Sequence, residues 1–245
     1  MLTVRNLQTR VNGCAVLHGV SLTIEDQSIT AILGDSGAGK TTLANSICGF
    51  VPISAGRMIF EGVDITRRSA CERLMRGMAC VPAELRLFPE MSVLENLEFG
   101  SADCTNVPAS GQIEFVLSLF PELQPSLSAS ARFLPLGLQR VLMLARALMS
   151  APRLLVVDQP SFGLSGEQTQ TLQRAISQLN SRHAITILLL EQNLFQAVKL
   201  ADTVYCMSHG RVTARHSGLE LLADRELQTE FLRGALQPGT EVVFQ

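Results

Sequence analysis

The eight residues Gly34–Thr41 constrain the fold more than any other stretch of the chain. They read GDSGAGKT, fit the pattern G-x-x-x-x-G-K-[ST], and stand between an unbroken apolar run (28–34) and a stretch typical of a helix (41–49). In such a strand–turn–helix unit, backbone N–H groups converge on an anion, and the helix N-terminus adds positive charge. The chain is therefore predicted to hold phosphates here. A chance glycine-rich turn is disfavoured because both flanking elements also match.

The same loop predicts which residues hold a nucleoside triphosphate and its metal. Lys40 would reach the β- and γ-phosphates, and the Thr41 hydroxyl would ligate Mg²⁺. Asp158 ends the apolar run 154–158, which alone would indicate an ordinary strand end. Paired with the loop, it is predicted to hold the metal from the other side, because buried strands end at the ligand crevice. The expected nucleotide-binding residues are Gly34, Asp35, Ser36, Gly37, Ala38, Gly39, Lys40, Thr41 and Thr42.

Composition narrows the classes of function. The formal net charge is -2 and Lys/Arg do not cluster, so nucleic-acid binding is not expected. Apolar runs such as 154–157 and 187–190 are far shorter than the ~20 residues that span a bilayer, and the N-terminus lacks a signal-peptide pattern. We expect a cytoplasmic protein without direct membrane insertion. The six cysteines lack metal-ligand spacing and are expected to be reduced, buried thiols.

Hydrophobic patterns predict an α/β fold. Alternation at 2–4, 20–24 and 58–60 indicates a small antiparallel sheet, whereas the unbroken apolar runs 28–34, 154–158 and 185–190 are typical of a parallel sheet covered on both faces. Apolar residues recur at helical spacing after Gly137, and the stretch 101–135 suggests shorter helices joined by loops. The expected architecture is a P-loop NTPase core with a parallel sheet, a small antiparallel β subdomain and a helical insertion.

The order of motifs resembles the ATP-binding cassette (ABC) superfamily. The matching segments are GDSGAGKTT (34–42), a degraded signature LPLGLQR (134–140) and the segment 190–212. More narrowly, VLHGVSL (16–22), GRMIFEGVDIT (56–66) and CVPAELRLFPEMSVLENLEFG (80–100) resemble the ATP-binding subunits of branched-chain amino acid and urea importers.

This resemblance implies a fold, ligands and partners. It implies one nucleotide-binding domain over 1–236, with a helical subdomain at about 84–150, followed by a tail at 237–245. It also implies ATP and Mg²⁺, a second ABC ATPase subunit in a homo- or heterodimer, and integral membrane permease subunits. These would hold the chain on the inner face of the plasma membrane. Proteins of this superfamily that act in translation or DNA repair usually have two cassettes in one chain or long helical insertions. Neither pattern fits this sequence.

Several positions depart from the family pattern. The aromatic residue that stacks on adenine is replaced at about Val11, which should weaken binding without abolishing it. Ala83 stands where a glutamine senses the γ-phosphate and metal, and Glu84 could serve there only after a local shift. Gln192 takes the place of a histidine that contacts the γ-phosphate, as in the importer subgroup, and can still donate a hydrogen bond to a phosphate.

The signature departs furthest. Pro135 and Leu136 replace the serine and first glycine that face the partner's γ-phosphate, while Gly137 and Gln139 remain. Proline has neither hydroxyl nor N–H, and leucine adds a side chain where close approach is needed. We expect this chain to complete its partner's site poorly. The alternative, that LPLGLQR is only the start of an ordinary helix, stays open.

Gln159 occupies the position of the general base. Its amide can orient water but cannot take a proton, and loss of a general base typically costs about 10²–10⁴ in rate. Glu191 as a substitute base is disfavoured, since a glutamate at a strand end is more often a surface group. Two hypotheses follow: a transport ATPase subunit with weakened hydrolysis, or a non-hydrolysing scaffold or regulator of an active partner cassette. The solute, the type of dimer, and whether these changes are regulatory or decay stay open.

Overall fold

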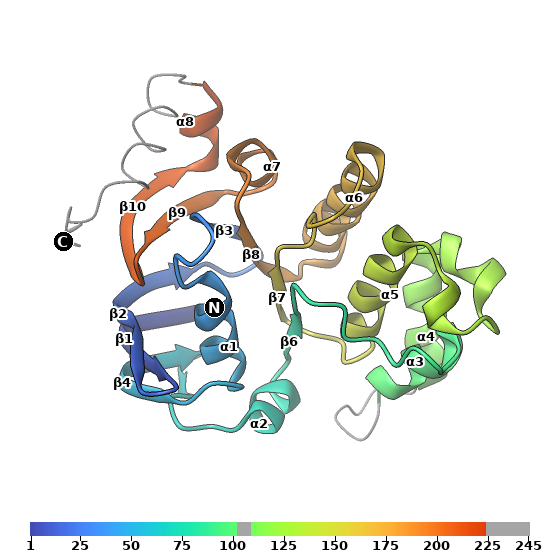
Figure 1. Ribbon diagram of the computed structural model, residues 1–245, viewed down its shortest axis with the longest axis horizontal. Coiled ribbons are helices and arrows are strands. Elements are labelled where there is room, and N and C mark those ends of the chain that lie inside the picture. Colours follow the sequence, from blue (N-terminus) through green and yellow to red (C-terminus); the bar gives the residue numbers. More distant parts are fainter. Residues whose placement is uncertain (102–108, 224–245) are drawn as a thin grey trace.

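The computed structural model describes residues 1–101 and 109–223 of the chain (Figure 1). An antiparallel sheet and a mostly parallel sheet lie on either side of α1 (Lys40–Cys48). A group of helices projects from the end of the molecule that lies away from the antiparallel sheet. The expected C-terminal tail, 237–245, lies outside the described residues. The predicted α/β architecture is confirmed.

The antiparallel sheet comes from the N-terminal quarter of the chain. Its strand order is β2-β1-β4-β5, with bounds β1 Leu2–Val11, β2 Cys14–Ile24, β4 Ile53–Phe60 and β5 Val63–Asp64. Asn12 and Gly13 both have positive φ and join β1 to β2 in a two-residue turn, which matches the twist of the hairpin. The predicted antiparallel strands are confirmed, although each is longer than its alternating core.

The second sheet holds the strands that were read as buried. Its order is β10-β9-β3-β8-β7-β6, with bounds β10 Arg211–Ser217, β9 Thr203–Ser208, β3 Ile29–Leu33, β8 Thr186–Glu191, β7 Leu154–Asp158 and β6 Met78–Val81. All neighbouring pairs are parallel except β9 with β10. Every residue of β3, β7 and β8 is buried, which confirms the prediction of a parallel sheet covered on both faces.

Alternate residues of each central strand face different helices. Leu188 and Leu190 of β8 pack in one apolar cluster with Leu43 of α1, whereas Ile187 and Leu189 share the other cluster with α6 (Gly166–His183) and α7 (Leu194–Val198). The two faces of the sheet are therefore distinct environments.

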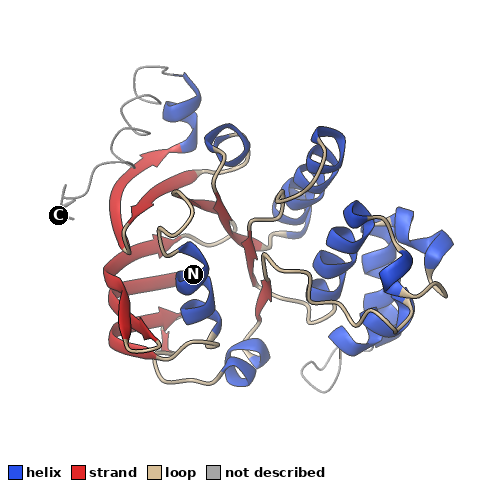
Figure 2. Ribbon diagram, viewed as in Figure 1, coloured by secondary structure: helices blue, strands red, loops and turns tan. Residues whose placement is uncertain are grey.

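Helices gather beyond the β6 edge of the sheet (Figure 2). They are α3 Val93–Gly100, α4 Ala109–Leu119, the 3₁₀ helices η1 Pro121–Ser126 and η2 Ala131–Phe133, and α5 Leu136–Leu148. The predicted helix after Gly137 is confirmed, and it buries Val141, Leu142 and Ala145. Two short helices complete the described chain: α2 Ala70–Met75 and α8 Gly218–Ala223.

The cysteines only partly follow expectation. Cys48 and Cys206 are buried and Cys80 is half-buried, but Cys14 and Cys71 are exposed; Cys104 lies outside the described residues. The prediction of buried thiols is wrong for Cys14 at a hairpin end and for Cys71 on α2. No cluster of metal-ligating side chains is found in residues 1–101 and 109–223. Within the same ranges, no helix has both the length and the apolar character needed to cross a bilayer.

Candidate nucleotide site

The loop between β3 and α1 has the backbone that the sequence pattern predicts. Gly37 and Gly39 have φ of 84° and 101°, in the left-handed region that favours glycine. A Cβ at Gly34 would overlap the carbonyl oxygen of Met207 in β9, so that strand closes the loop from behind. Asp35, Ser36 and Gly37 are exposed, whereas Ala38 is buried. The loop therefore presents its middle to a ligand.

Lys40 folds back over this loop. Its Nζ donates hydrogen bonds to the carbonyl oxygens of Gly34 (2.6 Å) and Asp35 (2.9 Å), and the side chain is buried. Burial lowers the pKa of Lys40, while attraction to Asp158, Asp35 and Glu191 opposes this shift. An ammonium held at the loop by neutral carbonyls is suited to an anionic phosphate, which is a stronger acceptor.

Asp158 and Thr41 meet, as the sequence predicts for a metal site. Asp158 is 2% exposed at the end of β7, and it accepts a hydrogen bond from the Thr41 hydroxyl. Burial raises the pKa of Asp158, and its Oδ1 is buried without a hydrogen-bond partner. A hard cation bound by carboxylate and hydroxyl oxygens would satisfy this oxygen, so the residues present fit Mg²⁺.

Gln159 follows Asp158 in a strained conformation. Its φ is 47°, which is uncommon outside glycine, and its N–H donates to the carbonyl oxygen of Leu190 in β8 (2.9 Å). The neighbouring strand therefore fixes the backbone of Gln159, at the predicted general-base position. The structure brings Gln159 to the same sheet edge as Asp158.

Gln192 also lies at this edge. It comes directly after β8, and Glu191 pairs in register with Leu33, the last residue before the phosphate loop. The side chain of Gln192 is exposed, and its N–H donates to Glu191 Oε2 (3.3 Å). The predicted γ-phosphate contact is therefore beside the loop.

Glu191 is not the surface group that the sequence led us to expect. It is 5% exposed and accepts a hydrogen bond from the Ser161 hydroxyl (2.8 Å). Together with Leu189, Glu191 lines a small cavity against Leu172 of α6, on the sheet face opposite to α1. The surface interpretation was wrong because α6 covers this strand end. Asp158 bonds Thr41 on the α1 side, so Glu191 does not face the predicted metal position.

Val11 and Ala83, two further residues that depart from the family pattern, lie in different parts of the fold. Val11 ends β1 and is half-buried. Ala83 follows β6, and its carbonyl oxygen accepts a hydrogen bond from Arg140, a buried residue that sequence reasoning missed. A basic residue in the first turns of a predicted helix gave no signal of burial. Glu84 is exposed and pairs with Arg86 (3.0 Å).

The degraded signature forms the start of α5. Pro135 is the N-cap residue and provides no side-chain hydrogen bond, and Leu136 is 39% exposed. Gly137 is buried, and a Cβ there would lie 2.6 Å from Nε2 of Gln168 in α6. Gln139 donates its side-chain amide back to the carbonyl oxygen of Leu134 (2.8 Å). Gly137, the glycine that remains of the signature, is thus covered by Gln168 of the same chain.

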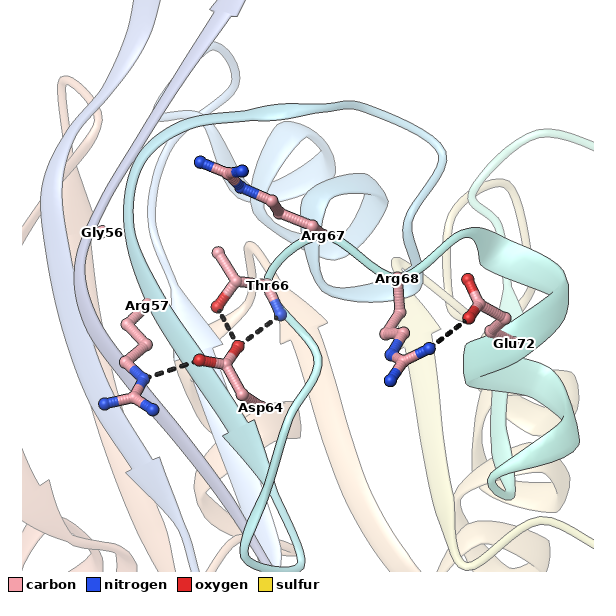
Figure 3. A pocket seen from close by; sticks show the side chains of 7 residues that line it. All are labelled: Gly56, Arg57, Asp64, Thr66, Arg67, Arg68 and Glu72. Carbon is pink, nitrogen blue, oxygen red and sulfur yellow. Dashed lines mark hydrogen bonds and ion pairs between the residues drawn. The ribbon is translucent and has the colours of Figure 1, made fainter.

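A separate polar pocket of about 580 Å³ lies between β4, β5 and the start of α2 (Figure 3). Arg57 and Thr66 converge on Asp64, and Arg68 pairs with Glu72 (2.7 Å). Hydrogen bonds from Thr66 and Arg57 lower the pKa of Asp64 to about 2. Both carboxylates are therefore engaged, and none of the predicted nucleotide-binding residues lines this pocket.

Comparison with known proteins agrees with this geometry. The family described as ABC transporter matches residues 17–162. The chain is 33% identical over 234 residues to the high-affinity branched-chain amino acid transport ATP-binding protein BraG of Pseudomonas aeruginosa, covering 96% of this chain and 100% of BraG. The probable branched-chain amino acid transport ATP-binding protein LivF of Archaeoglobus fulgidus is 30% identical, with 93% and 97% covered. The lipopolysaccharide export ATP-binding protein LptB of Escherichia coli is 28% identical, with 94% and 96% covered.

Solved structures share the fold. A nucleotide-free ATP-binding cassette from an ABC transporter superposes with a TM-score of 0.81 at 26% identity, covering 95% of this chain and 98% of that one. A cassette in its ADP conformation gives 0.80 at 26% identity, with 96% and 98% covered. A dimeric cassette bound to ADP and Pi, at 20% identity and a TM-score of 0.80, supports the fold alone. The chain belongs to the ABC transporter family, as one of its ATP-binding subunits.

Proposed function

We propose that this chain binds MgATP as the ATP-binding subunit of a branched-chain amino acid or urea-type importer, and that it hydrolyses this ATP slowly. The observation that carries the proposal is the convergence of Lys40, Thr41 and Asp158 beside an amide, Gln159, at the general-base position. The names of BraG and LivF support amino acid transport. LptB, at similar identity, serves another solute, so uptake must be measured directly.

The residues of this chain would divide the work as follows. The loop N–H groups and Lys40 bind and orient the phosphates, while Thr41 and Asp158 hold the metal. Bound Mg²⁺ would neutralise charge on the phosphates. Gln192 would donate a hydrogen bond to the terminal phosphate. Gln159 can orient a water molecule through its amide but cannot take its proton, so turnover is limited at that step.

An apolar groove supports the proposed permease contact. It has a volume of about 510 Å³ and opens between the core sheet and the helices α3 and α5. Phe50 and Phe99 line it with 60% and 53% of their surface exposed, and Phe99 packs edge-on against Phe88 with ring centroids 4.4 Å apart. Exposed aromatic side chains in a groove are typical of protein contacts. A permease docked there would hold the chain on the inner face of the membrane, next to a second ATPase subunit.

A second candidate function is that of a non-hydrolysing scaffold or regulator. The covering of Gly137 by Gln168, next to Pro135 and Leu136, favours it, because this chain would then offer a partner's nucleotide few donors. In that case MgATP binding would stabilise a pair whose turnover occurs in the partner's site.

The substitution Gln159→Glu separates these functions. We expect wild type to bind MgATP but release phosphate slowly, and Gln159→Glu to raise the rate by about 10²-fold or more through restored proton acceptance. Binding is measured by calorimetry, and phosphate release is measured alone and with candidate partner cassettes. Lys40→Ala is the control that should abolish both.

The possible results discriminate clearly. Rapid phosphate release by the isolated wild-type chain, lost in Lys40→Ala, would exclude the scaffold function and would also contradict the proposed slow hydrolysis. Failure of wild type to bind MgATP would contradict both functions. A reconstituted complex with permease subunits that takes up no amino acid or urea in the presence of ATP would contradict the importer assignment.

A further inference from the structure

The turn at 159–163, which contains Gln159, is held by side chains from β8 and α5. It begins at Gln159, where φ is 47°, and ends at Gly163, where φ is 80°. The N–H of Phe162 closes it on the carbonyl oxygen of Gln159 (3.1 Å). A left-handed residue other than glycine costs roughly 1–2 kcal/mol, and such residues persist where surrounding contacts fix them. The question is which contacts fix Gln159.

One contact is the buried carboxylate of Glu191. The Ser161 hydroxyl donates to Glu191 Oε1 (2.8 Å), and the Ser161 backbone N–H also bonds this carboxylate. The N–H of Gln192 donates to the other oxygen, Oε2 (3.3 Å). Within residues 1–101 and 109–223, Glu191 forms no ion pair within 4 Å. Its hydrogen bonds are therefore directed at the turn and at Gln192.

The other contact is the buried guanidinium of Arg140. This side chain is 7% exposed in α5 and donates to the carbonyl oxygens of Ala83 and Phe162, the latter at 3.4 Å. It has no acidic partner in the described part of the chain, and its Nε is buried without a hydrogen-bond partner. Arg140 therefore bridges the loop after β6 and the turn after β7.

Both charges are costly to bury, so a neutral pair of side chains would be the cheaper way to fill these positions. Hydrogen bonds to charged groups are stronger than neutral ones, and each of the two charged side chains forms at least one such bond with the turn. Ser161 and Phe162 are neighbours in the chain, so an anion on one side and a cation on the other hold consecutive residues. This arrangement resists rotation of the turn about Gln159.

We propose that Glu191 and Arg140 are positioning residues that hold the 159–163 turn from its two sides and thereby set the position of Gln159 beside Asp158. The proposal rests on the proposed function, since the position of Gln159 matters to the reaction only if this chain holds MgATP. Glu191 acts here through Ser161, and it does not replace the missing general base.

Amide hydrogen exchange on the full-length protein tests the contacts without requiring turnover. We expect Ser161→Ala and Arg140→Met to speed exchange of a peptide covering 159–164 by about tenfold, as loss of a charge-assisted hydrogen bond implies. Ser161→Thr keeps the hydroxyl and should exchange as wild type does. A peptide covering 34–48 should be unchanged in all three variants.

Two results would overturn the proposal. The first is wild-type exchange of the 159–164 peptide in either Ser161→Ala or Arg140→Met. The second is faster exchange by the same factor in every peptide, which would indicate a general loss of stability.

A kinetic comparison in the Gln159→Glu background adds a functional readout. Ser161→Ala should lower kcat about tenfold with KM unchanged, and Ser161→Thr should restore it. An unchanged kcat in Ser161→Ala would contradict the proposal. If Gln159→Glu itself shows no turnover, the slow-ATPase function fails, while the exchange experiment still decides whether the two charges position the turn.

Discussion

At the scale of single residues, the sheet edge that carries Asp158, Gln159 and Gln192, here called the nucleotide edge, contains groups that lower the stability of the fold. Asp158 keeps a buried oxygen without a partner, and Gln159 keeps a left-handed backbone. Burial raises the pKa of Asp158 and of Glu191, which means that the folded chain holds both carboxylates at a cost. Such costs concentrate where a ligand or a reaction needs them.

The cost at Glu191 gives a prediction about pH. Because its pKa is higher in the folded than in the unfolded chain, Glu191 favours folding at pH values below its unfolded pKa. This contribution is lost as pH rises through the folded pKa. Glu191→Gln keeps one acceptor oxygen for Ser161, gives up the longer bond from the Gln192 N–H (3.3 Å) and removes the buried charge, so we expect it to be more stable than wild type at pH 7.5.

The difference in the free energy of unfolding between Glu191→Gln and wild type should shrink toward pH 4. Urea unfolding of both proteins between pH 4 and 8, without nucleotide, measures this difference. A constant difference in the free energy of unfolding across that range would contradict the prediction.

At the scale of elements, helix α6 connects several parts of the site. Ser165 caps it in a capping box with Gln168, and the same Gln168 covers Gly137 of α5. The helix also supplies the side chains that enclose Glu191. The start of α6 therefore fixes both the remaining signature glycine and the strand end of β8.

We expect Ser165→Ala to lower the free energy of unfolding by about 1 kcal/mol, since the cap of an N–H group in the first turn is lost. Denaturant unfolding of both proteins measures this change in the free energy of unfolding. Ser181→Ala is the matched control, because Ser181 is exposed in the last turns of the same helix and its replacement removes no cap. Equal effects of the two substitutions would show that the capping box contributes nothing.

At the scale of the whole molecule, the nucleotide edge and the apolar groove lie at different places on the fold. The phosphate loop follows β3 in the middle of the parallel sheet, whereas β6 forms one edge of that sheet (Figure 1). The groove opens at the β6 edge, between the core and the helices. The two regions can therefore be altered separately.

This separation predicts that Phe99→Glu will weaken association with permease subunits by about tenfold or more while leaving MgATP affinity unchanged, because it places a charge in an apolar contact. Phe195→Glu is the control, since Phe195 is 60% exposed on α7, away from the groove. Co-purification with the permease and calorimetry with MgATP measure the two properties. Equal loss of association in both variants would contradict a specific role for the groove.

The sequence alone determined the parts of this protein that depend on neighbouring residues. The phosphate loop, the buried strands and the helix after Gly137 could be predicted, because each is encoded in a local pattern of glycine or apolar spacing. The resemblance to the ABC family also identified Gln159 and the degraded signature. These predictions concern residue identity and local backbone.

Only the tertiary structure decided what surrounds those residues. The burial of Glu191 under α6, the covering of Gly137 by Gln168, and the bridge from Arg140 to Phe162 all join residues far apart in the chain. Strands β9 and β10 were not predicted either, although Met207 of β9 closes the phosphate loop. The environment of a charged side chain depends on elements that pack on it from elsewhere, and hydrophobic periodicity does not specify which elements those are.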